Sequence, residues 1–286
     1  MEILINSQNY EINSQNLDDL RFEILQNFEK FQLKKFGFCF DDFDKNWNDL
    51  VKILDGFAVK NANFTQNNKN LIFIKKGVMP PKEILKSMIE SRNSPSLNNA
   101  LKSAVIGVAG LGGLGSNIAL FLARVGVKKL VLVDFDIVEP SNLNRQNYFV
   151  KHIGLYKTKA LKSLISQVNP FVEVETFEVF LDEKNICEIF KDCKIICEAF
   201  DNPKSKAMIA NFAPNFKDKK LILASGMAGI YDSNLIKTQK FATNVYICGD
   251  LKNGAKIGDG LMAPRVAICA GHQANLVLRL LNDLED

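Results

Sequence analysis

Glycines between two apolar runs carry the clearest chemistry in this sequence. The stretch Val105–Asn117 reads VIGVAGLGGLGSN, and a second apolar run, LVLVDFD, follows at Leu130–Asp136. Glycine permits a sharp turn and a close approach of the backbone to a phosphate, while the N–H groups that open the next helix favour anionic oxygens. The pattern predicts a nucleotide-binding βαβ unit, in which the last glycine lets the helix pack closely on the strand; its glycines are Gly110, Gly112, Gly113 and Gly115.

An acidic residue follows the second apolar run. Asp134 stands about 20 residues after the glycines, where a carboxylate can accept hydrogen bonds from ribose hydroxyls. This pattern indicates a nucleotide without specifying which one, and a dinucleotide-dependent oxidoreductase is the default interpretation. The residues that follow Asp134 change that interpretation.

Size, charge and composition limit the classes of protein to consider. The chain has 286 residues, of which 47% are hydrophobic and 24% charged, which is typical of a globular protein with one large core and a small extra domain. The net charge of +4 is too small to indicate a nucleic-acid partner. No apolar run approaches the ~18 residues that span a bilayer, and the first residues lack a signal-peptide pattern. We therefore expect a cytoplasmic protein with neither a membrane nor a nucleic-acid partner.

Cysteines are scattered through the chain without a CxxC pair. Neither a disulfide framework nor a zinc site is indicated, so we expect no zinc. A position in the core is the expectation for each of the six, which are Cys39, Cys187, Cys193, Cys197, Cys248 and Cys269.

Residues 1–76 are predicted to form a separate small domain. Apolar residues alternate with polar ones near Ile3 and Tyr10, which predicts a hairpin, and Asn16 is expected to cap a helix. One face of that helix is apolar, and short strands are expected at Phe57–Val59 and Leu71–Ile74, an order typical of a β-grasp fold. The aromatic residues within 32–55 are expected in the core of this domain, with a binding surface as the alternative. Residues 77–100 are expected to form a helical linker, with a short helix from about 82 to 91.

Residues 101–286 alternate between strand and helix patterns. Such alternation is typical of an α/β fold, a doubly wound and mostly parallel Rossmann-like sheet. The strands are expected at 104–109, 130–134, 172–179, 195–199 and 221–225, and the helices at 116–125, 157–168, 204–212 and 264–281.

Five motifs in order carry a resemblance to a known family. They are GLGGLG, the run DFDIVEPSNLNRQ that begins at Asp134, the GxxK at Gly154 to Lys157, the NP at Asn169, and the DN at Asp201. In this order they resemble the ThiF and MoeB group of the ubiquitin-activating-enzyme superfamily over roughly residues 88–283. The N-terminal extension, the segment SGMAG at 225–229 and the C-terminal helix are most similar to ThiF-type adenylyltransferases of thiamine biosynthesis.

The resemblance implies an activity. Such enzymes use ATP and magnesium to adenylate the C-terminal carboxylate of a ubiquitin-fold sulfur carrier, here a ThiS-like protein ending in Gly-Gly, and they release pyrophosphate. A carboxylate that attacks a triphosphate must overcome like-charge repulsion, so the site needs cations and a metal more than a general base. A homodimer is also implied.

Site residues follow from the same resemblance. It implies that Arg145 and Lys157 bind phosphates, that Asn142 contacts the triphosphate and that Asp201 binds magnesium. Arg92 resembles the arginine that reaches the triphosphate from the neighbouring subunit, and Asp134 would hold the ribose. Surface charges at Arg145 and Lys157, and a helix cap at Asp201 and Asn202, are the structural alternatives. Further ATP contacts are expected at Asp136, Asn144, Gln146 and Asn202.

The chain departs from the family pattern in several places. The zinc-binding cysteine pairs of many members are missing, and the loop 249–261, where a sulfur-handling cysteine usually lies, contains none. Cys248 borders that loop and is the candidate, although adenylation needs no cysteine. The N-terminal unit resembles ThiS itself but continues past Gly77, so it cannot be activated as fused; we expect it to serve in dimerisation or docking.

The sequence leaves other functions to consider. A second enzyme of the same superfamily would adenylate a molybdopterin carrier or a carbamoyl group on transfer RNA. An NAD-binding oxidoreductase predicts no role for Arg145 or Lys157. A non-catalytic scaffold predicts the loss of both side chains, yet both are present.

Overall fold

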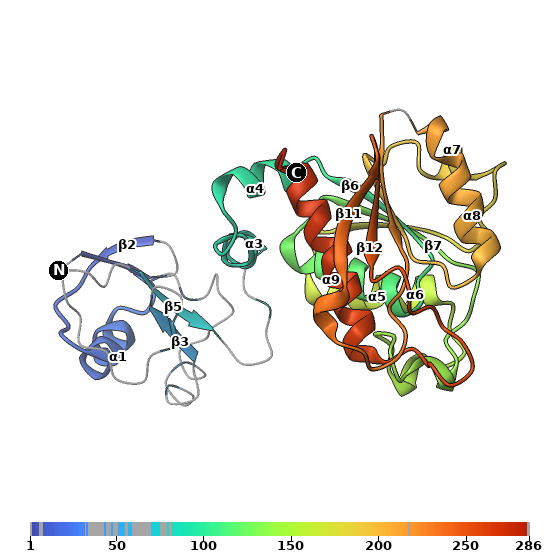
Figure 1. Ribbon diagram of the computed structural model, residues 1–286. Helices are drawn as coiled ribbons and strands as arrows, with labels where there is room; N and C mark the ends of the chain where they lie inside the picture. Colours follow the sequence, from blue (N-terminus) through green and yellow to red (C-terminus); the bar gives the residue numbers. More distant parts are fainter. Residues whose placement is uncertain are drawn as a thin grey trace. The chain divides into compact units, whose positions relative to one another are not determined.

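The computed structural model describes residues 2–5, 8–31, 33, 43, 47, 51–54, 57–58, 70–74, 79, 82–216 and 218–284. The chain divides into two compact units, Met1–Ser91 and Arg92–Asp286 (Figure 1). The predicted division at 76 and 100 stays a prediction. Among the described helices, none is both long and apolar enough to cross a membrane.

The described part of the first unit contains a small sheet and two helices. Its described elements are β1 (Glu2–Ile5), β2 (Gln8–Glu11), α1 (Leu17–Gln26), β3 (Val51–Leu54), β4 (Phe57–Ala58), β5 (Asn70–Ile74) and α3 (Lys82–Glu90). The strand order is β2-β1-β5-β3-β4, with β1 and β2 antiparallel and β1 and β5 parallel. The hairpin is confirmed, whereas assignment to the β-grasp fold stays a prediction.

Local chemistry explains α1. Oδ1 of Asn16 accepts hydrogen bonds from the backbone N–H groups of Asp18 and Asp19, so the predicted cap is confirmed. The apolar face of the helix is buried, and Phe43 and Trp47 are buried with it, which favours the core interpretation of these aromatics over a binding surface. The other aromatics of the segment 32–55 lie outside the described residues.

The second unit contains a seven-stranded sheet of order β11-β12-β10-β9-β6-β7-β8. Its strands are β6 (Val105–Ala109), β7 (Lys129–Val133), β8 (Glu173–Phe177), β9 (Ile195–Glu198), β10 (Lys220–Ala224), β11 (Lys237–Ala242) and β12 (Val245–Gly249). Neighbouring strands are parallel except for the edge strand β11, which is antiparallel to β12. The predicted doubly wound, mostly parallel sheet is confirmed.

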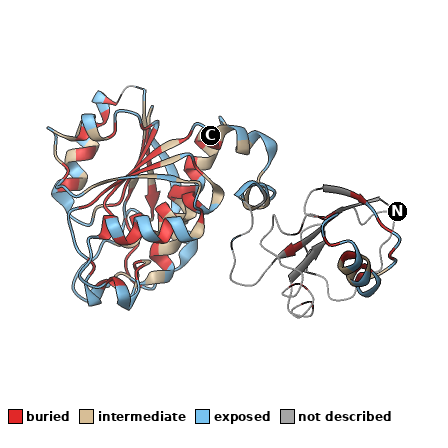
Figure 2. Cartoon of the chain, turned by 180° about the vertical axis from the view of Figure 1, so that it is seen from behind, coloured by how far each residue is buried: buried red, intermediate tan, exposed pale blue. Residues whose placement is uncertain are grey.

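Helices cover both faces of this sheet (Figure 1). They are α5 (Gly113–Val125), α6 (Lys157–Val168), α7 (Ile186–Ile189), α8 (Pro203–Phe212) and α9 (Ala263–Leu281), and α4 (Pro95–Leu101) packs against α9. Side chains alternate along each strand, so Leu130 packs in the cluster beneath α5, α6 and α9 while Val131 packs with α7 and α8. The buried residues between these layers form the core (Figure 2).

Cysteine placement agrees with the sequence in most cases. Cys193, Cys197, Cys248 and Cys269 are buried as predicted. Cys187 is exposed, so its predicted core position is wrong; it lies on the short surface helix α7, where the neighbouring Ile186 is the buried side chain. Cys39 lies outside the described residues.

Strand order fixes the place for a ligand. From the central β6 the chain passes to β7 and β8 on one side and then returns to β9 on the other side. In doubly wound sheets, ligands bind outside the carboxyl ends of strands at such a switch point. The residues that follow β6, β7, β9 and β10 are therefore the candidates for the site.

Candidate nucleotide-binding site

The glycine turn after β6 has the geometry that the sequence predicts. Gly110 has φ +91°, in the left-handed region that glycine favours, and its N–H donates to the carbonyl of Val133 at 2.9 Å. A Cβ atom at Gly115 would lie 1.9 Å from the carbonyl oxygen of Gly110, so α5 packs directly on the turn. Within the described part of the chain, no side chain caps the first turn of α5, whose N-cap is Gly112. This end of the helix can therefore present N–H groups to an anion.

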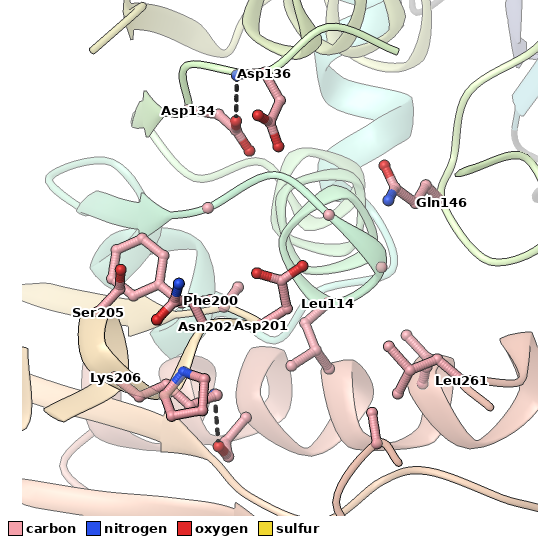
Figure 3. Close-up of a pocket in the computed structure, with 18 of the residues that line it drawn as sticks. Leu114, Asp134, Asp136, Gln146, Phe200, Asp201, Asn202, Ser205, Lys206 and Leu261 are labelled. Atoms are coloured by element: carbon pink, nitrogen blue, oxygen red, sulfur yellow. Dashed lines mark hydrogen bonds between the residues drawn. The ribbon is translucent and has the colours of Figure 1, made fainter. Parts of the chain in front are cut away.

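A cavity of about 420 Å³ lies at the switch point (Figure 3). Its walls include the glycine turn, the ends of β7, β9 and β10, and residues of the segment before α9. The volume suits a small ligand of nucleotide size. Ten of the predicted site residues line it: Gly110, Gly112, Gly113, Asp134, Asp136, Arg145, Gln146, Lys157, Asp201 and Asn202.

Asp134 holds a fixed carboxylate at the end of β7. Its Oδ2 accepts from the backbone N–H of Leu111 at 2.6 Å, and its Oδ1 accepts from the N–H of Asp136 at 2.8 Å (Figure 3). Burial raises the pKa of Asp134, and the nearby Lys157 ammonium opposes that rise. A carboxylate offers about four lone-pair positions, so acceptor capacity remains for hydroxyl donors.

Lys157 is the first residue of α6 and is buried although it is charged. Its Nζ lies 2.8 Å from Oδ2 of Asp136 in a salt bridge, and its backbone N–H donates to the carbonyl of Asp136. The carboxylate partner is half exposed at the cavity, so an incoming phosphate can share the ammonium. The alternative of a solvated surface charge does not describe Lys157.

Two buried polar atoms of residues near the glycine turn lack partners in the described part of the chain. Nη1 of Arg145 donates to the carbonyl of Ser141 at 3.2 Å and to Oδ1 of Asn144 at 2.8 Å. Nε of Arg145 and Oε1 of Gln146 are buried and have no hydrogen-bond partner among the described residues. A buried polar atom without a partner costs about 1–3 kcal/mol. Both residues line the cavity, so a bound ligand is the natural source of the missing partners.

Asp201 and Asn202 follow β9 at the rim of the cavity. Oδ1 of Asn202 accepts from the N–H of Lys204 at 2.8 Å and caps α8, so the capping alternative applies to Asn202. Among the described residues, no three His, Cys, Asp or Glu side chains gather as a metal cage. Magnesium is commonly held by one or two carboxylates together with substrate phosphates, and the Asp201 carboxylate suits that arrangement.

Other predicted residues lie outside the cavity lining. Asn142 serves its own turn, since its Oδ1 accepts from the N–H of Glu139 at 3.0 Å. Asn144 and Arg145 border an adjoining surface depression together. Arg92 is exposed between α3 and α4. The catalytic or binding roles of these residues stay predictions.

Cys248 lies within β12 and is fully buried. Burial raises the pKa of its thiol to about 11, and the hydroxyl of Thr238, 3.6 Å from Sγ, opposes that rise. Because the thiolate is the reactive form, this environment disfavours sulfur chemistry.

One ion pair of the site was missed from sequence. Nζ of Lys206, which lines the cavity, lies 2.8 Å from Oε1 of the buried Glu198 and also donates to the carbonyl of Ala224. The Glu198 carboxylate accepts from the N–H groups of Phe200 and Ala224, so it ties the ends of β9 and β10 together. The sequence signal that could have revealed this pair is the acidic Glu198 at the end of an otherwise apolar strand.

The strand order and the glycine turn define the class of protein: a doubly wound α/β protein with a cavity at its switch point. Within that class, the chain belongs to the ThiF family, whose sequence model matches residues 87–286. The resemblance found in the motifs is thereby confirmed.

Individual relatives match over shorter stretches. The adenylyltransferase and sulfurtransferase UBA4 of Eremothecium gossypii is 36% identical over 128 residues, which cover 44% of this chain and 29% of that protein. The molybdopterin-synthase adenylyltransferase of Haemophilus influenzae is 39% identical over 92 residues, or 31% of this chain and 37% of that protein. The chain thus matches well under two thirds of either relative.

A solved structure shares the fold. The E. coli tRNA N6-threonylcarbamoyladenosine dehydratase TcdA, solved in complex with AMP, superposes with a TM-score of 0.59 and 22% identity. The match covers 67% of this chain and 90% of that chain. At this identity the likeness supports the α/β architecture alone.

Proposed function

We propose that this chain is an adenylyltransferase that uses ATP to activate the C-terminal carboxylate of a ubiquitin-fold sulfur carrier. The observation that carries the proposal is a pair of buried atoms without a partner among the described residues, Arg145 Nε and Gln146 Oε1, on two residues that line the cavity beside the glycine turn. Membership of the ThiF family and the names of its adenylyltransferase relatives support it.

The reaction needs charge stabilisation more than proton transfer. A carboxylate oxygen of the carrier bonds to the α-phosphorus of ATP, the bond from that phosphorus to the bridging oxygen breaks, and pyrophosphate leaves with the electron pair. The attacking group and the triphosphate are both anionic, so cations must offset their repulsion. Arg145 and Lys157 supply positive charge beside the α5 N-terminus, where N–H groups also favour phosphate.

The rest of the cavity suits the nucleotide and its metal. The Asp134 carboxylate would accept hydrogen bonds from the ribose hydroxyls, because two backbone N–H groups already fix its orientation. Asp201 would hold Mg²⁺, and the bound ion would supply further neutralisation of phosphate charge. Asp136, Asn144, Gln146 and Asn202 complete the proposed ATP contacts, with Asn142 and Arg92 as outlying contributors.

We propose a ThiS-like carrier with a Gly-Gly end, and hence a role in thiamine biosynthesis, because the SGMAG segment, the N-terminal extension and the C-terminal helix resemble ThiF-type enzymes most. A homodimer, a cytoplasmic location, and docking or dimerisation through the first unit belong to the same proposal. A molybdopterin-type carrier is the alternative that the Haemophilus relative favours.

ATP–pyrophosphate exchange with purified carriers tests this proposal. We expect exchange with the ThiS-like carrier and a loss of about 10²-fold or more in Arg145→Ala and in Lys157→Ala, since each removes charge stabilisation from the transferred phosphate. Lys159→Ala is the matched control, because its ammonium lies on the same helix but is largely exposed and pairs with Glu178. Near-normal exchange in both site variants would refute adenylation at this cavity.

A further inference from the structure

A third charged pair, which includes none of the proposed nucleotide contacts, lies near the cavity. Nη2 of Arg265, in the first turn of α9, lies 2.5 Å from Oδ2 of Asp250, which follows β12. The two side chains are only 5% and 3% exposed. Charges buried to this degree require partners, and the loss of one partner leaves the other uncompensated.

Each member of the pair holds further chain segments. Nη1 of Arg265 donates to the carbonyls of Tyr231 and Asp232, both at 2.7 Å. Oδ1 of Asp250 accepts from the N–H groups of Lys252 and Asn253 at 2.9 and 2.8 Å. The pair therefore joins the start of α9 to residues 231–232 and 250–253.

The segment 250–253 packs on residues that line the cavity. The carbonyl of Gly226 accepts from the N–H of Asp250 at 2.9 Å, and that of Ser225 accepts from the N–H of Leu251 at 3.1 Å. A Cβ atom at Gly226 would lie 2.1 Å from Oδ1 of Asp250, so the carboxylate packs directly on the wall. We define this wall as residues 225–227 and 250–261; the members that line the cavity are Ser225, Gly226, Met227, Gly254, Ala255 and Leu261.

We propose that Arg265 and Asp250 are positioning residues whose ion pair holds this wall closed over the cavity and keeps water from the activated acyl group. The chemical consequence rests on the proposed adenylation. In an open site, a water oxygen would bond to the acyl carbon of the acyl adenylate, and the bond from that carbon to the AMP oxygen would break. AMP would leave with the electron pair, the protons of water would pass to solvent, and the carrier carboxylate would return unmodified.

Limited trypsin digestion of the full chain tests the wall without any reaction. Lys252 and Lys256 are exposed cleavage sites inside it. Breaking a buried pair favours local opening, so Arg265→Met should speed cleavage at these sites about 10-fold or more. Arg265→Lys, which keeps the charge, should restore part of the protection. Arg124→Met removes an exposed arginine from α5 and should digest like the parent chain.

Asp250→Asn is the second variant and keeps a side-chain oxygen for the N–H groups of Lys252 and Asn253. It should also speed cleavage at Lys252 and Lys256, because it removes the charge that faces Arg265. Equal cleavage rates in Arg265→Met, Asp250→Asn and the parent would overturn the proposal.

A single-turnover measurement adds the chemical readout. With ATP and the carrier, Arg265→Met should release AMP from the acyl adenylate about 10-fold faster than the parent, the same factor as the opening equilibrium that admits water. The amount of pyrophosphate that this variant releases in the single turnover should match that of the parent. Unchanged AMP release beside normal pyrophosphate release would count against the wall's role. If the parent chain released no pyrophosphate with any carrier, adenylation would fail, while the digestion result would still decide whether the pair closes the wall.

Discussion

Two helical glycines should respond in opposite directions to the same substitution. At Gly115 in α5, an added Cβ would lie 1.9 Å from the carbonyl oxygen of Gly110 and 2.9 Å from its carbonyl carbon. Non-bonded carbon contacts favour ~3.5–4.0 Å, so the helix or the phosphate-facing turn must move by roughly 1 Å or more. At Gly271 in α9, no atom of the described residues outside the helix's own backbone lies within 4 Å of the added atom.

The expected free energies follow from those contacts. Overpacking against backbone costs about 1–3 kcal/mol, so Gly115→Ala should destabilise the second unit by at least that amount and weaken ATP binding through the displaced turn. Gly271→Ala should stabilise it by about 0.5–1 kcal/mol, because alanine is favoured over glycine in a helix interior. Each kcal/mol corresponds to about 2–4 °C in Tm for a unit of this size.

Thermal unfolding followed by far-ultraviolet circular dichroism, with ATP binding by calorimetry, measures both effects. We expect the Tm of Gly271→Ala to rise and that of Gly115→Ala to fall. A Gly115→Ala chain with the parent's Tm and ATP affinity would refute the close packing of α5 on the turn.

Two further predictions concern the thiols and the nucleotide. Because burial raises the pKa of Cys248 to about 11, its thiol is protonated at neutral and mildly alkaline pH, and its thiolate fraction grows only as pH rises toward that value. Iodoacetamide at mildly alkaline pH should therefore label the exposed Cys187 and spare Cys248, as read from peptide mass spectra. The Cys248→Ala variant should keep both ATP–pyrophosphate exchange and the formation of the carrier thiocarboxylate. Loss of the thiocarboxylate alone would reveal a sulfur relay through Cys248. Calorimetry should detect the binding of ATP with magnesium and no binding of NAD, since the cations Arg145 and Lys157 line the cavity and would offset a triphosphate; tight NAD binding without ATP binding would restore the oxidoreductase interpretation.

The fold was largely predictable because strands buried on both faces read as apolar runs. β7 contains the apolar run Leu130–Val133 and β9 the run Ile195–Cys197, and apolar residues recur at helical spacing in the helices between strands. β11 was missed because every residue of this edge strand is exposed, which leaves no apolar face in the sequence. The start of α5 was placed three residues late, at Ser116 instead of Gly113, because glycine disfavours helices and only tertiary packing on the turn overrides that preference.

Local motifs predicted one part of the site and left out another. The glycine turn and Asp134 belong to one βαβ unit, so spacing alone indicates their meeting. The partners Asp250 and Arg265 stand on different elements, and periodicity predicts burial without naming a partner. Asn142 illustrates the reverse case, since resemblance assigned it a ligand while its amide oxygen accepts from its own turn.

The pattern of charge pairing separates Arg145 from the other cations of the cavity. Lys157 is paired with Asp136 and Lys206 with Glu198, so each ammonium is already balanced by a carboxylate. Among the described lining residues, Arg145 is the cation held only by neutral acceptors, a carbonyl and an amide oxygen, and its Nε has none. A triphosphate that enters the cavity therefore meets its least compensated positive charge at Arg145. We therefore expect the loss of Arg145 to reduce pyrophosphate exchange by removing this uncompensated charge, and the loss of Lys157 to reduce exchange by leaving the Asp136 carboxylate unpaired beside the triphosphate.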